Sequence, residues 1–141
     1  MNVGKFILNI VVAYIVYGVL YTVGPMFIAA DAFMAAEAAM KPMEETGMAV
    51  MAYHLVQTVV VVWLFDKAVG SGDMKAAVVF GLMVGLYLVA TDSVWYTMLK
   101  DFPQDTRMPI MGMHLVNNAI VAVVLAFMAG KGWGSSAKAE G

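Results

Sequence analysis

Apolar and polar positions divide the chain into four long apolar stretches separated by shorter polar segments. The stretches cover residues 6–23, 48–65, 76–99 and 108–129. Each reaches or nearly reaches the roughly 20 residues that a helix needs to cross about 30 Å of hydrocarbon. They are continuous, whereas the strands of a transmembrane barrel are ~10-residue alternating segments. The pattern therefore predicts an all-α, four-helix transmembrane bundle, with residues 1–141 forming a single integral membrane domain.

The polar segments between these stretches differ in length. Residues 66–75 and 100–107 are rich in charged residues, glycine or proline, and are typical of short turns. The link over residues 24–47 is longer and mixes acidic residues with phenylalanine and methionine. Such a mixture predicts a short amphipathic helix on the membrane surface, with a mobile methionine-rich loop as the alternative.

Composition narrows the environment and the partners. Hydrophobic residues make up 62% of the chain and charged residues 13%, against roughly 45–50% and about 25% in soluble domains. Lipid must therefore cover much of the surface. The absence of cysteine excludes disulfides and thiolate metal sites. A net charge of -2 without a basic run argues against a nucleic-acid partner.

The distribution of basic residues predicts an orientation. With four spans, both termini lie on one side of the membrane. That side carries Lys5, Lys67, Lys75, Lys131 and Lys138, and the other carries Lys41, Lys100 and Arg107. This excess favours cytoplasmic termini under the positive-inside rule.

The second and fourth stretches resemble each other at a spacing of 60 residues. Met48, Met51, His54, Leu55 and Val56 match Met108, Met111, His114, Leu115 and Val116. The first and third stretches match more weakly at a spacing of 75, over Val19, Tyr21, Thr22 and Phe27 against Val94, Tyr96, Thr97 and Phe102. These matches predict a duplicated two-helix hairpin with halves at about 1–67 and 75–130. The alternative is coincidence among apolar residues.

Short motifs connect the chain to a known group. The run Gly18-Val19-Leu20-Tyr21, then Pro25-Met26-Phe27, and the His114-Leu115-Val116 opening of the last stretch are similar to a group of small bacterial four-helix membrane proteins of unknown function. This sequence has Leu20-Tyr21 where the group usually has Trp-Tyr. The resemblance implies topology and a bacterial inner-membrane location, and it implies no activity.

Three ionisable residues interrupt the apolar stretches, namely His54, Asp92 and His114. Each histidine lies six residues into its stretch, and Asp92 lies seven residues before Leu99, where the third stretch ends. At 1.5 Å per residue, all three sit roughly 9–10 Å below the same interface. Ionisable groups at such depths are costly and mark a functional-site hypothesis.

Each predicted helix carries one polar, aromatic or small-residue stripe at helical spacing. The stripes are His54, Gln57 and Thr58; His114, Asn117 and Asn118; Gly81, Gly85, Asp92 and Tyr96; and Tyr14, Tyr17, Gly18 and Tyr21. The glycines form a G-x-x-x-G pair that allows another helix to approach closely. We expect the four stripes to face one another inside the bundle.

Three functional hypotheses follow from this polar layer. The leading one is a non-enzymatic accessory or structural membrane protein, packed with itself or in a larger complex through interhelical hydrogen bonds. The second is a haem, chlorin or divalent-metal site in which His54 and His114, with Asp92, supply the ligands. The further candidate residues of this site are Gln57, Asn117, Asn118, Thr58, Tyr21 and Tyr96. The third is a pathway for protons or a small solute. Phosphate-binding, nucleophile-elbow and zinc-protease motifs are absent from the sequence, which disfavours an enzyme.

Overall fold

The structure, a computed structural model, describes residues 1–38, 40–101 and 103–136. In chain order its elements are α1 (Val3–Ile28), α2 (Ala30–Glu37), α3 (Met43–Ala68), α4 (Met74–Met98), the 3-10 turn η1 (Gln104–Thr106) and α5 (Arg107–Gly130). No strand occurs in these described residues. The predicted all-α four-helix bundle is therefore confirmed.

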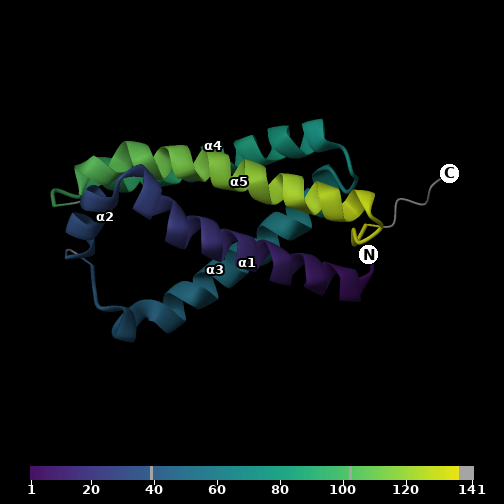
Figure 1. The fold of residues 1–141 in the computed structure, drawn as a ribbon, viewed down its shortest axis with the longest axis horizontal. Coiled ribbons are helices and arrows are strands. Elements are labelled where there is room, and N and C mark those ends of the chain that lie inside the picture. Colours follow the sequence, from purple (N-terminus) through teal and green to yellow (C-terminus); the bar gives the residue numbers. More distant parts are fainter. Residues whose placement is uncertain (39, 102, 137–141) are drawn as a thin grey trace.

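The four long helices run alternately up and down. α1 begins and α5 ends at one end of the bundle, while α2 and the α4–α5 connection lie at the other (Figure 1). Each long helix, with η1 counted as part of the last, is long and apolar enough to cross a membrane. By length and composition, these are the helices of an integral membrane protein.

All four long helices begin before the predicted apolar stretches, and α1 and α3 extend furthest beyond them. α1 continues through Pro25 to Ile28, and α3 begins at Met43, before its two glutamates. Acidic residues in the first turn interact favourably with the helix dipole and stabilise the start of the helix. A helix can therefore begin in a polar segment that hydropathy assigns to a loop. Proline is tolerated within membrane helices because neighbouring groups satisfy the freed carbonyl.

The 24–47 link contains the predicted short helix. α2 spans eight residues and packs against α1 and η1 at the end of the bundle away from the termini. Its Ala36 is buried, and it carries an acidic residue, Asp31, in its first turn. The alternative of a structureless loop does not hold for the described part of this link.

Local hydrogen bonds define where the helices begin. The Asn2 side chain accepts a hydrogen bond from Lys5 N at 3.1 Å at the start of α1. Asp73 Oδ1 accepts from the backbone nitrogens of Lys75 and Ala76 at 2.9 and 3.0 Å at the start of α4. Such caps satisfy N–H groups that have no partner within the helix. Gly70, with φ 56°, makes the turn that precedes α4.

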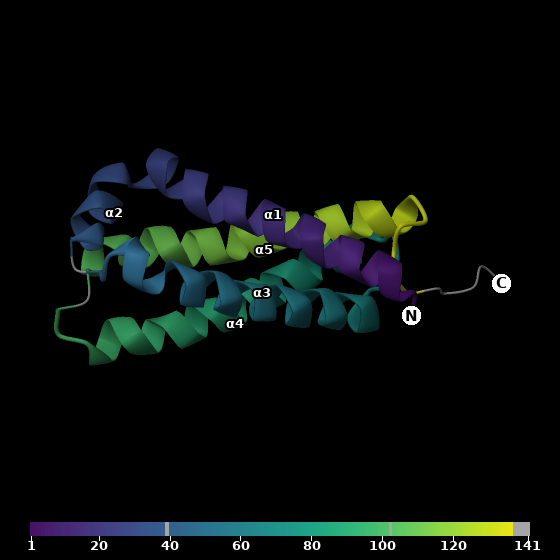
Figure 2. The ribbon, with the colours of Figure 1, turned by 90° about the horizontal axis from the view of Figure 1, so that it is seen from below.

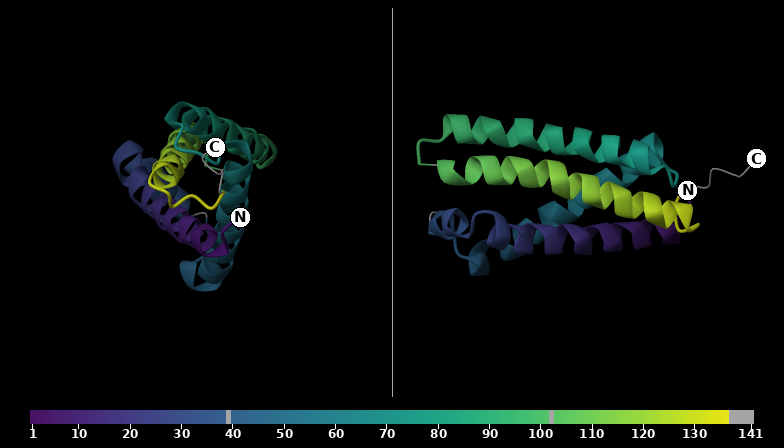
Figure 3. Two further views of the ribbon diagram at one scale, coloured as in Figure 1. Left: turned by 90° about the vertical axis from the view of Figure 1, so that its right-hand side faces the viewer. Right: turned by 45° about the horizontal axis from the view of Figure 1, so that its top comes forward.

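The α4–α5 pair is the most closely packed part of the molecule. The two helices lie side by side along their whole length (Figure 3). A Cβ atom on Gly81 would collide with the backbone of Asn118 and Ala119, and one on Gly85 would lie 2.6 Å from the His114 carbonyl oxygen. Both glycines therefore permit the close approach of α5.

An apolar core fills the half of the bundle nearer the termini, and all four long helices contribute to it. Its members are Ala13, Val62, Phe65, Val69, Ala77, Val121, Ala122, Leu125 and Ala126. The Phe65 and Phe80 rings meet edge to face, with centroids 5.5 Å apart. In this half the inward stripe of α3 is Thr58, Val62 and Phe65, rather than the predicted one centred on His54.

α3 is close to α4 and α5 only over its C-terminal part (Figure 1). It begins well apart from α4 and α5 and approaches them toward its C-terminal end (Figure 1), and α1 and α3 are joined through α2 rather than by a tight turn (Figure 2). The two halves of the predicted repeat therefore pack differently. Duplication of a hairpin stays a prediction, and its Phe27–Phe102 match lies partly outside the described residues.

Candidate functional site: a polar layer between α1, α4 and α5

His114 is the centre of the polar layer. It lies on α5, seven residues beyond Arg107, and only 9% of the residue is exposed. Its Nε2 is 2.8 Å from Asp92 Oδ2 on α4, and its Nδ1 is 2.7 Å from the Tyr21 hydroxyl on α1. One imidazole thus joins three helices. The tyrosine and imidazole rings also lie close, with centroids 5.8 Å apart.

A second set of hydrogen bonds lies one turn deeper. Tyr17 donates its hydroxyl hydrogen to Asn118 Oδ1 at 2.5 Å, and Asn118 Nδ2 donates to the His114 carbonyl oxygen at 2.7 Å. Asn118 is 2% exposed. The two tyrosines stand one turn apart on α1, so the same helix face bonds to α5 at two levels.

The two contacts of the His114 ring determine which atom donates and which accepts in each hydrogen bond. A neutral imidazole has one donor nitrogen and one acceptor nitrogen. When Asp92 is ionised it can only accept, so Nε2–H donates to it and Nδ1 accepts from the Tyr21 hydroxyl. Protonation of the imidazole would make both nitrogens donors, and the tyrosine would then have to accept. Every ring nitrogen is bonded in either state.

Asp92 is the open end of this layer. Its side chain is 38% exposed, against 11% for that of His114. Only its Oδ2 is bonded to His114. In a membrane helix an exposed carboxylate is costly unless a polar partner or water reaches it. Asp92 is thus the member of the layer with spare hydrogen-bonding capacity.

His54 does not join the layer, which corrects the expectation that the four stripes face one another. Every residue from Met48 to Gln57 is exposed. Among the described residues, His54 Nδ1 pairs with Gln57 Oε1 on its own helix, at 3.2 Å. The physical reason is the path of α3: His54 shares a helix face with buried Thr58, but the helix has diverged from α5 before it reaches this level.

The remaining predicted residues have separate roles. Thr58 donates its hydroxyl hydrogen to the His54 carbonyl oxygen of its own helix at 2.8 Å. The buried Tyr96 bonds through its hydroxyl to Thr106 Oγ1 at 2.7 Å, which ties α4 to the start of α5. Asn117 is 5% exposed and lines an open apolar groove between the end of α1 and the start of α5. Its Nδ2 is buried without a hydrogen-bond partner among the described residues.

Sequence reasoning placed Tyr17 on the correct face but left it out of the candidate site, and it missed Thr106. The i, i+4 spacing of Tyr17 and Tyr21 was the available signal for the first. Thr106 precedes the fourth apolar stretch, so hydropathy assigned it to a turn. Its burial depends on the fold of the α4–α5 connection, where Gln104 Nε2 also donates to the Tyr96 carbonyl oxygen at 2.9 Å.

The geometry bears on the cofactor hypotheses. Within the described residues, no group of three histidine, aspartate or glutamate side chains converges as a metal site would require. The predicted set of His54, His114 and Asp92 is not brought together within one chain, because His54 is on the exposed part of α3. Both ring nitrogens of His114 are bonded to protein side chains. Ligation of a haem, chlorin or metal would require one of those bonds to break.

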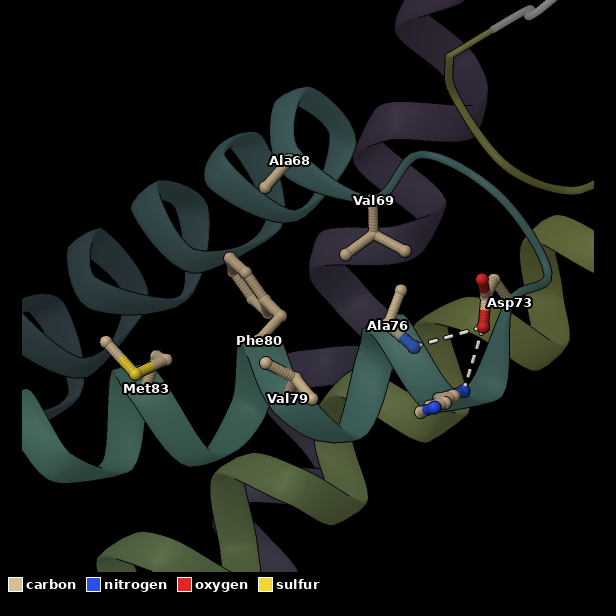
Figure 4. A pocket seen from close by; sticks show the side chains of 8 residues that line it. Ala68, Val69, Asp73, Ala76, Val79, Phe80 and Met83 are labelled. Atoms are coloured by element: carbon tan, nitrogen blue, oxygen red, sulfur yellow. Dashed lines mark hydrogen bonds between the residues drawn. The ribbon is translucent and has the colours of Figure 1, made fainter.

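Besides the groove lined by Asn117, a hollow lies against the α3–α4 turn, nearer the termini (Figure 4). Its volume is about 490 Å³, and it is lined by Ala68, Val69, Asp73, Lys75, Ala76, Val79, Phe80 and Met83. Asp73 is its acidic lining residue and is already bonded to backbone nitrogens at the start of α4. This hollow therefore offers little chemistry beyond its apolar surface.

Comparisons with family models, with curated proteins and with solved structures find no match to this chain. The resemblance to small bacterial four-helix membrane proteins stays a prediction. The molecule that emerges is a four-helix membrane bundle with one hydrogen-bonded polar layer.

Proposed function

We propose that this chain is a small, non-enzymatic accessory or structural membrane protein whose polar layer holds the bundle together. The observation that carries the proposal is that the polar groups around His114 bond to one another across helices. Tyr21 on α1 and Asp92 on α4 bond to the His114 ring. Asn118 donates to the His114 carbonyl oxygen within α5 and accepts from Tyr17 on α1. Interhelical hydrogen bonds of this kind contribute about 0.5–2 kcal/mol each to helix association in membranes.

An accessory role also accounts for the exposed part of α3. Residues 48–57 are all exposed and include a histidine and a glutamine. The contact with α1 in this segment is the Tyr14 hydroxyl, which donates to the Met51 carbonyl oxygen at 3.2 Å. His54 and Gln57 are polar groups that lipid covers poorly. The uncovered part favours a protein whose role includes association with another membrane component, either a second copy or a larger complex.

The first test is an absorption spectrum and an elemental analysis of the detergent-purified protein beside a His54→Ala/His114→Ala double variant. The proposal expects a colourless parent without stoichiometric metal, and a double variant that unfolds more readily. A Soret-type band or a bound metal that is present in the parent and lost in the variant would replace it with the cofactor hypothesis.

One observation favours a second candidate, a proton-binding site that communicates with one side of the membrane. A continuous hydrogen-bonded chain runs from Asp92, which is partly exposed, through His114 to Tyr21. Beyond it, toward the termini, lies the apolar core, and the buried Asn9 Oδ1 and Asp66 Oδ2 there have no hydrogen-bond partner among the described residues. The hydrogen-bonded chain thus stops at this level, which opposes a complete pathway. The test is pH-driven proton flux into liposomes: flux abolished by Asp92→Asn would favour this candidate, and no flux in the parent would exclude a pathway.

A further inference from the structure

The exposed N-terminal part of α3 presents polar groups that have no partner within the described chain. His54 and Gln57 bond to each other, which leaves His54 Nε2 and the Gln57 amide nitrogen without a hydrogen-bond partner among the described residues. Both side chains belong to exposed residues. Unpaired donors in hydrocarbon are costly, so lipid is a poor cover for this face.

The same chain carries the complementary group at the same level. Asp92 has a side chain that is 38% exposed, and only its Oδ2 is bonded to His114. His54 lies nine residues after Glu45, and Asp92 lies eight residues before Lys100. Since both charged residues border the end of the bundle away from the termini, the two groups sit at depths that agree within about one helical turn, roughly 12–14 Å along each helix.

We propose that two copies of this chain pair in the membrane, with His54 and Gln57 of one copy donating to Asp92 of the other. A single chain cannot close this contact, because the beginning of α3 has diverged from the α4–α5 pair (Figure 1). A two-fold axis along the membrane normal keeps the depths matched and gives two equivalent contacts, as in an isologous dimer. The inference rests on the proposed accessory function and names its partner as a second copy.

The α3 surface supports a helix contact as well as the polar one. Around His54, the same face carries Met51, and every residue from Met48 to Gln57 is exposed. α1 contacts this segment where the Tyr14 hydroxyl donates to the Met51 carbonyl oxygen at 3.2 Å, so the second copy would approach from the sides that α1 leaves uncovered. Methionine is flexible and fits irregular contacts. Opposite this face, Val56 is 62% exposed and apolar, as a lipid-facing position should be.

Association can be measured by energy transfer between dyes, because the chain has no native cysteine and a single one can be introduced at exposed Lys75. The labelled protein is reconstituted into phosphatidylcholine/phosphatidylglycerol vesicles at decreasing protein-to-lipid ratios. We expect concentration-dependent transfer, and an association constant about tenfold lower for His54→Ala, since two symmetric contacts are lost. Val56→Ala is the matched control and should associate like the parent.

A complementation experiment makes the pairing specific. Neither His54→Ala nor Asp92→Ala can form the histidine–carboxylate contact with itself, but a mixture restores one of the two contacts, between the intact His54 of one chain and the intact Asp92 of the other. Alanine is used at position 92 because asparagine would keep an oxygen that accepts hydrogen bonds. The mixed pair should associate more strongly than either variant alone. If Asp92→Ala fails to fold, the comparison of His54→Ala with Val56→Ala decides the question.

Three results would overturn the inference. They are a parent that stays monomeric at every protein-to-lipid ratio, an equal effect of His54→Ala and Val56→Ala, or a mixed pair no stronger than the variants alone. A monomer would leave the accessory function standing with a different partner. A bound chromophore or metal would instead contradict the accessory function, whatever the oligomeric state.

Discussion

At the scale of single residues, the two histidines differ in what surrounds them. His114 uses both ring nitrogens to join α1, α4 and α5, whereas the partner of the His54 ring among the described residues is Gln57 on its own helix. In the predicted repeat they are matching positions, 60 residues apart. Their environments separate a residue that holds the bundle together from one that faces its surroundings.

Replacement of His114 by alanine should therefore destabilise the folded chain by about 1–3 kcal/mol, because the Tyr21 hydroxyl and the Asp92 carboxylate lose their partner. The free energy of unfolding can be measured in mixed micelles by circular dichroism, at a dilution where the chain is monomeric. His54→Ala is the control and should change it by no more than about 0.5 kcal/mol. Equal losses for the two variants would contradict the assigned role of His114.

Tyr17 allows a gentler test of the layer. Tyr17→Phe keeps the ring and removes only the hydrogen bond of 2.5 Å to Asn118. We expect a loss of about 1 kcal/mol in the free energy of unfolding. Tyr53→Phe is the matched control, since Tyr53 is 69% exposed and should tolerate the change. An unchanged stability for Tyr17→Phe would mean that Asn118 finds another partner at no cost.

At the scale of secondary-structure elements, the sequence predicted which helices exist but not which way all of them face. The four apolar stretches correspond to α1, α3, α4 and α5, because length and hydropathy are local properties. Which face of a helix is buried is harder to predict in a membrane protein, since lipid-exposed and buried side chains are both apolar. The polar stripe was a reliable guide on α5 and misleading at His54, where the path of α3 depends on contacts distant in sequence.

Glycine spacing predicted the α4–α5 contact because small residues act through the backbone itself. A methyl group on Gly81 would collide with the α5 backbone. Gly81→Ala should thus force the helices apart and cost about 1–3 kcal/mol in the free energy of unfolding. The matched control is Gly112→Ala on α5, which meets no atom within 4 Å and should be neutral or stabilising by up to about 1 kcal/mol. A Gly81→Ala variant as stable as the Gly112→Ala variant would argue against this close approach.

At the scale of the whole molecule, the bundle is divided along the membrane normal. The half nearer the termini is closed by an apolar core to which every long helix contributes. The other half is stabilised by the hydrogen bonds around His114, and there α3 lies apart from α4 and α5 (Figure 1). Stability and association are thus assigned to different ends, so a variant in the exposed part of α3 can change assembly without unfolding the chain.

The arrangement of the spans makes a prediction about topology. Four crossings place the α3–α4 turn on the same side as the termini and the α4–α5 connection on the other, and the basic residues favour the termini on the cytoplasmic side. Because the chain has no cysteine, Ser71→Cys and Asp101→Cys each give one reactive thiol. In intact cells a membrane-impermeant maleimide should label Asp101→Cys, and it should label Ser71→Cys only after permeabilisation. The reverse pattern would invert the orientation and keep four spans, whereas labelling of both from outside would contradict the crossing of α4.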